Sequence, residues 1–164
     1  MATTPDPVNQ TTKLDLLLSR TLAASPAAVW KAWTTPDLLR IWWTPPPFTT
    51  PECEMDLRPG GLFRALMRGP DGTEHTHKGV FLDVVDQRRL AFTDALEADY
   101  RPTGGGFMTA IITFEAVAGG TRYTARVLHK DEADRERHEQ MGFFDGWGTA
   151  TRQLEAVAAG LTPS

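Results

Sequence analysis

The sequence predicts an α+β fold in which a curved antiparallel sheet is covered by one long helix near the carboxyl terminus. Two patterns lead to this class. Short segments with alternating apolar and polar residues, separated by turns rich in glycine, proline and aspartate, are typical of a β-meander. They are followed by a segment whose apolar residues recur every three or four positions, as they do along one face of a helix. One sheet and one covering helix make a two-layer arrangement.

The chain is expected to begin its structure with a strand and two short helices. From Leu14 onward leucine recurs at every second position, which predicts a strand with one buried face. The strand ends before Ser25, which can cap a helix, and Pro26, which suits the first helical position. Val29 and Trp33, four residues apart, give this helix an apolar face. A second short helix follows Thr35-Pro36, and its apolar side chains are those of Leu38, Leu39, Trp42 and Trp43.

Six further strands are expected, over residues 52–57, 62–68, 76–85, 90–94, 108–114 and 121–129. In the first of them, acidic residues alternate with Cys53, Met55 and Leu57, so we expect the acids to face solvent and these three the interior. In the last, Tyr123 and His129 lie on the face opposite three polar residues, which directs both inward. They are expected either to meet a ligand or, as is usual for buried polar groups, to be hydrogen-bonded within the protein.

Residues 131–159 are expected to form the long helix, with Asp131 or Asp134 at its start and Gly160 at its end. At 1.5 Å per residue it is roughly 40 Å long, enough to cross a sheet of about six or seven strands. Its apolar stripe consists of Phe143, Trp147, Ala150, Leu154, Val157 and Leu161.

Three glycines, Gly142, Gly146 and Gly148, lie beside this stripe, and each costs up to about 1 kcal/mol relative to alanine in a helix. Two explanations stay open. One is a kink or close packing against a neighbouring element, which is the usual reason for such glycines. The other is that small residues beside Phe143 and Trp147 leave room for a ligand.

Composition places the chain among ordinary globular proteins. Its 164 residues, 41% of them hydrophobic, suit one domain. We expect residues 13–164 to form that domain. Residues 1–12 are polar and show no periodicity, so they are expected to be a disordered lead-in.

Charge and cysteine content argue against several partners and sites. The net charge of −4 and the scattered basic residues make nucleic acid an unexpected partner. With one cysteine, the chain cannot form an internal disulfide or a cysteine-based zinc site. No apolar run approaches the roughly 20 residues of a membrane span. No signal peptide is recognisable, so we expect a cytoplasmic protein.

Several short segments follow one another in a defined order: Ala24–Thr34, Leu38–Trp43, Asp56–Gly61, Gly69–Gly72, Arg89–Thr93, Gly119–Arg122, and Met141–Phe143 with Gly146–Trp147. This set, which spans about residue 16 to residue 160, resembles the family of heat-shock protein 90 ATPase activator homologues. The resemblance implies the helix-grip fold of the START-like SRPBCC superfamily, in which the sheet wraps around the long helix and two short helices follow the first strand. It also implies a cavity between helix and sheet, and a chaperone as a partner.

We expect the chain to bind a small hydrophobic or aromatic ligand in that cavity, with no catalytic residue assigned. The expected lining is Met55, Phe63, Phe92, Tyr123, His129, Phe143 and Trp147. Two alternatives stay open: a stress-related partner of heat-shock protein 90, and a polyketide-cyclase-like enzyme that uses His129 and Tyr123 as acid and base. The sequence leaves open whether the chain forms a homodimer.

The remaining candidate groups predict no further chemistry. His75 and His77 point to the same side of a strand, and without a third ligand nearby we expect two exposed polar residues and no metal site. Cys53 has no neighbouring base, so it is expected to behave as a small apolar residue. No cofactor motif is present, and no cofactor is expected. We interpret the glycine-rich segment 104–106 as a mobile loop at the cavity mouth.

Overall fold

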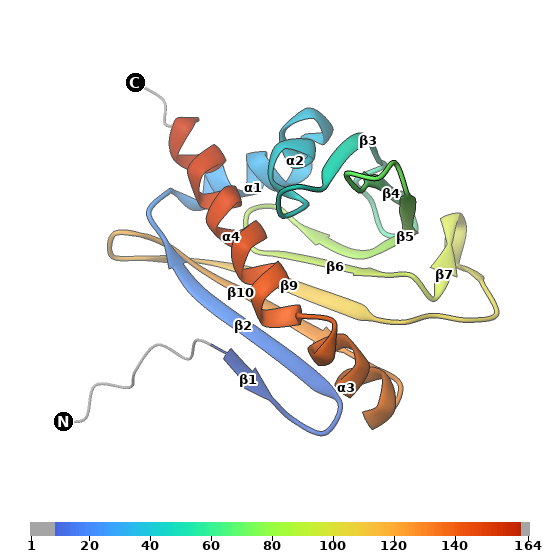
Figure 1. Cartoon of the computed structure of the whole chain (residues 1–164). Helices are drawn as coiled ribbons and strands as arrows, with labels where there is room; N and C mark the ends of the chain where they lie inside the picture. Colours follow the sequence, from blue (N-terminus) through green and yellow to red (C-terminus); the bar gives the residue numbers. More distant parts are fainter. Residues whose placement is uncertain (1–8, 162–164) are drawn as a thin grey trace.

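A computed structural model describes residues 9–161 of the chain. These residues form an eight-stranded antiparallel sheet with the order β1-β2-β10-β9-β6-β5-β4-β3, together with four α-helices. Helix α4 runs diagonally across β2, β10 and β9, and α1 and α2 lie at one end of it (Figure 1). The predicted α+β helix-grip fold is confirmed.

The main sheet consists of β1 (Asn9–Thr11), β2 (Asp15–Leu22), β3 (Thr49–Met55), β4 (Leu62–Arg68), β5 (Glu74–Val85), β6 (Arg89–Thr93), β9 (Thr109–Val117) and β10 (Gly120–Leu128). A small separate hairpin is formed by β7 (Leu96–Glu97) and β8 (Arg101–Pro102). The helices are α1 (Pro26–Thr34), α2 (Pro36–Trp42), α3 (Glu132–Gln140) and α4 (Phe143–Gly160). None of the helices within residues 9–161 is long and apolar enough to cross a membrane.

Helix α1 begins as its capping residues predict. The hydroxyl of Ser25 accepts a hydrogen bond from the amide of Ala28 at 3.2 Å, and Pro26 occupies the first turn. Val29 and Trp33 are both fully buried, which confirms the apolar face read from their spacing. Because Thr35 ends α1 and precedes a second proline, α2 starts at once and turns its own tryptophan, Trp42, into the same core.

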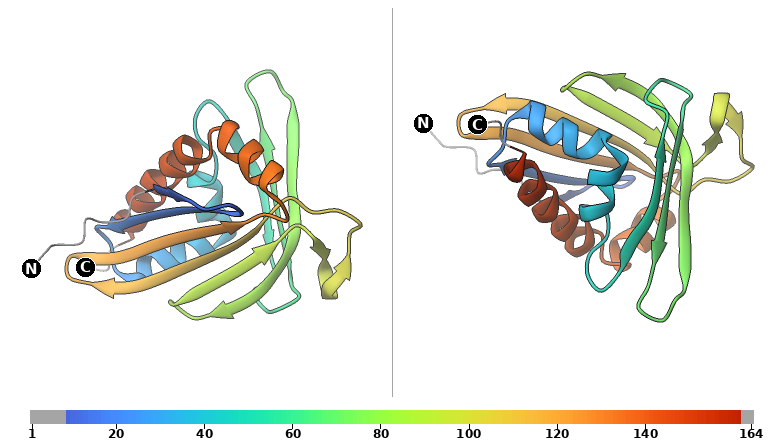
Figure 2. Two further views of the ribbon diagram at one scale, coloured as in Figure 1. Left: turned by 90° about the horizontal axis from the view of Figure 1, so that it is seen from below. Right: turned by 90° about the horizontal axis from the view of Figure 1, so that it is seen from above.

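The sheet bends strongly, and its concave side holds the core. In both views of Figure 2 the green strands β4 and β5 stand steeply against the orange pair β9 and β10. Register shifts between β3 and β4 and between β5 and β6 accompany this bend, as bulges commonly do. Along β10, Tyr123, Ala125 and Val127 are buried between more exposed residues, so the predicted phase of this strand is confirmed.

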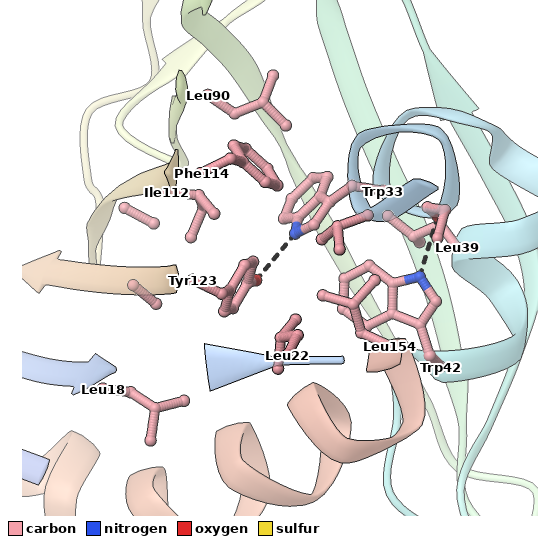
Figure 3. Packing of buried hydrophobic residues seen from close by; sticks show 14 of the residues in the cluster. Leu18, Leu22, Trp33, Leu39, Trp42, Leu90, Ile112, Phe114, Tyr123 and Leu154 are labelled. Atoms are coloured by element: carbon pink, nitrogen blue, oxygen red, sulfur yellow. Dashed lines mark hydrogen bonds between the residues drawn. The ribbon is translucent and has the colours of Figure 1, made fainter. Parts of the chain in front are cut away.

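Trp33 lies at the centre of the core (Figure 3). Its ring centroid is 5.5–5.7 Å from those of four other aromatic side chains, which are Trp42, Trp43, Phe63 and Phe92. Leu154 of α4 is fully buried in the same cluster. The core therefore joins α1, α2, α4 and the sheet in one apolar contact.

The single long helix predicted for residues 131–159 is wrong in one respect, because two helices occupy this segment. Asp131 caps α3 by accepting a hydrogen bond from the amide of Asp134 at 2.8 Å, so the predicted start is confirmed. The break comes at Gly142, whose φ of +93° is a left-handed conformation that favours glycine. After it, Phe143 and Leu154 are buried and Trp147 is half-buried against the core, as the apolar stripe predicts.

Two other local predictions need correction. The lead-in was expected to be disordered through residue 12, but Asn9–Thr11 pairs antiparallel with β2 as strand β1; residues 1–8 lie outside the described part. Strand β3 ends at Met55, so Leu57 falls in the turn that follows and is 40% exposed instead of facing the interior. An alternating pattern does not show where pairing stops, because that depends on the partner strand.

Candidate ligand-binding cavity

A cavity of about 360 Å³ lies between the first half of α4 and the concave side of the sheet. This volume is near the low end of the range for small-molecule pockets. Four of the five tryptophans line it, namely Trp33, Trp42, Trp43 and Trp147. Met67, Phe107, Met108 and Met141 add further apolar surface. None of its lining residues, all of which lie in the described part of the chain, carries a carboxylate, ammonium or guanidinium group.

The tryptophan wall is held in place by hydrogen bonds. Nε1–H of Trp33 donates to the hydroxyl oxygen of Tyr123 at 2.9 Å, as the dashed line in Figure 3 marks. Nε1–H of Trp42 donates to the carbonyl oxygen of Ala32 at 3.0 Å. Since both indoles are buried and bonded, their rings form a rigid wall and need no rearrangement to meet a flat ligand.

Gly142, which precedes α4, and Gly146 and Gly148, which lie within it, have three different surroundings. Gly142 provides the left-handed link between α3 and α4. A Cβ added to Gly148 would touch the Arg20 side chain at 3.5 Å, whereas one added to Gly146 would meet no atom within 4 Å. Gly146 also lines the cavity. The kink therefore explains Gly142, and open space beside the cavity explains Gly146.

Tyr123 places a hydroxyl group in the cavity wall. Its oxygen accepts the hydrogen bond from Trp33, and among residues 9–161 no group accepts the hydroxyl hydrogen. Complete burial raises the pKa of this phenol well above its ordinary value, so the group stays protonated. Tyr123 is therefore a neutral hydrogen-bond donor.

His77 is half-buried in the cavity wall, which corrects the prediction that it is exposed. At this position β5 pairs with β4 alone, and the partner of His77 is Ala65, whose small side chain leaves room for the imidazole. The ring packs on Phe63 and Phe92, at centroid distances of 4.8 and 5.5 Å. Its Nε2 is buried and has no hydrogen-bond partner in the described part of the chain. Burial lowers the pKa of His77 to about 4, so the ring is neutral at pH 7.

The alternation of residues along β5 could have predicted that His77 faces the core. His77, Gly79 and Phe81 alternate along β5, and Phe81 is an apolar residue expected to face the core. The same alternation places His77 on the core side. His75 is exposed as predicted, because it pairs with Met67 at the far end of the strand, beyond the deepest part of the core.

A second imidazole, His138 of α3, also lines the cavity. Its Nδ1 lies 2.9 Å from Nε2 of His129, and Nδ1 of His129 lies 2.9 Å from the carbonyl oxygen of Leu14. Burial, together with the neighbouring His129, lowers the pKa of His138 to about 4. Sequence reasoning missed His138 because α3 is almost entirely polar and offers no apolar stripe that would show which side faces inward.

Of the seven residues predicted to line the cavity, Tyr123 and Trp147 do so. The other five lie outside its wall: Met55, Phe63, Phe92, His129 and Phe143. Phe63 and Phe92 form the layer behind Trp33, and Met55 is half-buried at the end of β3.

The remaining two of these five residues, His129 and Phe143, pack behind the cavity wall near α3. His129 stands behind His138, and Phe143 stands behind Trp147 with 5.0 Å between the ring centroids. For these seven residues the alternation along the strands and the helix predicted the inward side correctly, but it does not show how deep each side chain lies.

The structure does not pair Tyr123 with His129 as the acid–base alternative requires. Within residues 9–161, Tyr123 bonds to Trp33, and both nitrogens of His129 are taken by other groups. Burial raises the pKa of the Cys53 thiol to about 11, which makes it a poor nucleophile at neutral pH. In the same part of the chain, no three His, Cys, Asp or Glu side chains come together in a group that could hold a metal ion.

Solved structures closely resemble this one. A crystal structure of a protein from Nitrosomonas europaea is 42% identical in sequence, with a TM-score of 0.88 over 92% of this chain and 97% of that chain. A protein from Mycobacterium smegmatis is 26% identical, with a TM-score of 0.78 over 98% and 99%. An AHSA1-like protein from Aeromonas hydrophila, at 24% identity and a TM-score of 0.72 over 92% and 97%, shares the fold.

Two further comparisons concern the sequence alone. Comparison with curated proteins gave no match. The sequence pattern of the family described as Activator of Hsp90 ATPase homolog 1-like protein matches residues 23–159. This range includes α1, α2 and α3, six of the eight strands of the main sheet, and nearly all of α4. The chain therefore belongs to the Activator of Hsp90 ATPase homolog 1-like family, which has the SRPBCC fold.

Proposed function

We propose that the chain binds a small, mainly apolar molecule in the cavity between α4 and the sheet. The observation that carries this proposal is the cavity of about 360 Å³, whose lining residues, all in the described part of the chain, include four tryptophans and no carboxylate, ammonium or guanidinium group. Pockets for small molecules are mainly apolar, with a few polar groups that orient the ligand. Here the hydroxyl of Tyr123 and the imidazole of His138 are polar groups of that kind.

The helix side of the cavity supports the proposal independently. Gly146 sits in the interior of α4, where alanine is more favourable by about 0.5–1 kcal/mol. An alanine methyl group would meet no other atom within 4 Å, so packing does not demand glycine here. A glycine at this position is explained if the space beside it is kept open for a ligand.

An uncharged fluorescent probe tests the proposal. N-phenyl-1-naphthylamine has two aromatic units and one N–H donor, and we expect it to bind with micromolar affinity, about −8 kcal/mol. The Gly146→Leu variant should bind at least about tenfold more weakly, a loss of about 1.4 kcal/mol, because the new side chain fills the cavity. Titration of probe fluorescence measures both constants.

Gly160→Leu is the matched control for this experiment. Gly160 also lies in α4 with no atom near its added Cβ, but it is exposed at the end of the helix, far along the chain from the cavity lining. Gly160→Leu should bind the probe as the wild-type protein does. Absence of binding to the wild-type protein, or equal binding by Gly146→Leu, contradicts the proposal.

A second candidate function is contact with a chaperone of the heat-shock protein 90 class, which the family description suggests. One surface favours it. Ile41 of α2 is 63% exposed and Phe48 is 44% exposed, and both line one open hollow between α2 and β3. Two exposed large apolar side chains that line the same hollow are suited to contact with a partner protein.

The ATPase rate of a purified heat-shock protein 90 tests the second candidate. We expect the wild-type chain to raise this rate and the double variant Ile41→Ser with Phe48→Ser to lose the effect, while it still binds the fluorescent probe. A rate that the wild-type chain leaves unchanged would exclude direct activation. Ligand binding and activation are thus measured separately.

A further inference from the structure

The two histidines near α3 form a hydrogen-bonded chain whose direction is fixed by the backbone. The carbonyl oxygen of Leu14 can only accept, so Nδ1 of His129 carries a hydrogen and donates it. A neutral His129 then presents Nε2 as an acceptor, and Nδ1 of His138 donates to it. A neutral His138 with its hydrogen on Nδ1 keeps a free lone pair on Nε2.

The residue that carries this lone pair lines the cavity. His138 is 8% exposed and belongs to the cavity lining. Its Nε2 has no hydrogen-bond partner in the described part of the chain and is not among the sealed, unpartnered atoms, so it keeps accessible surface on a residue that lines the cavity. The rings of Phe107, Phe143 and Trp147 surround the imidazole, with centroids 4.8, 5.1 and 6.3 Å from its own.

This setting defines the chemistry that fits beside His138. Aromatic rings on several sides favour a flat aromatic ligand. An imidazole lone pair requires a hydrogen-bond donor. A carboxylate is disfavoured for two reasons. It would face the imidazole lone pair, and it would lose its hydration in a cavity whose lining has no cationic group to compensate. A cation would find no carboxylate in this lining to balance its charge.

We propose that the cavity selects an uncharged aromatic molecule that carries a hydroxyl group, and that this hydroxyl donates its hydrogen to Nε2 of His138. The inference rests on the proposed function, since it names the ligand class of the same cavity. His138 is the contacting residue. His129 is a positioning residue, because it keeps the hydrogen of His138 on Nδ1 and so keeps Nε2 an acceptor.

Three naphthalene derivatives test the inference at pH 8, where imidazoles are neutral and a phenolic hydroxyl keeps its hydrogen. We expect 2-naphthol to bind about tenfold more tightly than naphthalene, a difference of about 1.4 kcal/mol, and 2-naphthoate to bind more weakly than both. Without a partner in the cavity the hydroxyl would lose its bonds to water, and naphthalene would bind more tightly. The sign of the difference therefore decides the question.

Variants locate the hydrogen bond. In His138→Phe the preference for 2-naphthol over naphthalene should disappear while naphthalene still binds. In His77→Phe the preference should remain. If instead the preference survives His138→Phe and is lost in His77→Phe, the hydroxyl lies on His77 and the inference is wrong. If naphthalene binds without any preference for 2-naphthol, the inference fails alone; if no compound binds, the proposed function fails with it.

The tautomer of His138 can be read without a ligand or a variant. Long-range ¹H–¹⁵N correlation spectra of the wild-type protein distinguish a protonated from an unprotonated imidazole nitrogen. We expect both His129 and His138 to carry their hydrogen on Nδ1 at pH 8. A hydrogen on Nε2 of His138 would overturn the inference even if His138→Phe does not fold.

Discussion

His77 shows how one side chain links burial, charge and stability. The imidazole lies against Phe63 and Phe92 with Nε2 sealed from solvent, so a proton on it has no counter-charge within hydrogen-bond reach. Burial is the main cause that holds its pKa at about 4, and Asp94 opposes the shift only in part. The ordinary value in an unfolded chain is about 6.5.

This difference predicts acid sensitivity. Between pH 6.5 and about 4 the unfolded chain binds a proton at His77 that the folded chain does not, so stability is complete above this window and falls as the pH is lowered through it. The slope is at most about 1.4 kcal/mol per pH unit for this group. Urea unfolding of His77→Phe between pH 7 and 4.5 should show a shallower loss than the wild-type protein.

Two features of the chain sharpen that comparison. His138 has the same sign of shift and remains in the variant, so part of the slope should persist. The exposed His75 provides the control, since His75→Asn should follow the wild-type curve. An unchanged slope in His77→Phe would show that the imidazole is not buried as described.

Helices α3 and α4 differ in what holds them in place. Helix α3 is polar and has a side-chain cap at Asp131, whereas α4 has no side-chain cap and is anchored by buried residues such as Phe143 and Leu154. The left-handed Gly142 lets α4 change direction after α3 and lay its apolar stripe on the core. This turn also brings His138 over the cavity, beside Trp147.

Two alanine substitutions in this region should have opposite effects. Gly142→Ala forces a side chain into the left-handed region and should lower the free energy of unfolding by about 1–2 kcal/mol. Gly146→Ala lies in regular helix with open space and should raise it by about 0.5–1 kcal/mol. Chemical denaturation measures both, and a neutral Gly142→Ala would contradict the need for glycine at the link.

For the whole molecule, the order of strands and helices follows from local patterns, and the cavity does not. Alternation gave β4 and the inward face of β10, and the Ser25-Pro26 pair gave the start of α1. The depth of each side chain was beyond such reasoning, because it depends on how the sheet bends. His138 shows this most clearly: it is a residue of a polar helix that the turn at Gly142 and the bond to His129 bring to the cavity.

The central claim is that four tryptophans form the wall of a cavity that admits an aromatic molecule. The fifth, Trp30, is absent from that lining and packs on Phe114 with 5.4 Å between ring centroids. Its indole is therefore an internal control within the same protein.

The most direct test is a ¹H–¹⁵N correlation spectrum of the indole groups during titration with 2-naphthol. A ring bound in the cavity should shift the signals of Trp33, Trp42, Trp43 and Trp147 along one saturating curve and leave that of Trp30 in place. If the Trp30 signal shifts as much as the others, or if no indole signal shifts, there is no such cavity in solution and the account is contradicted.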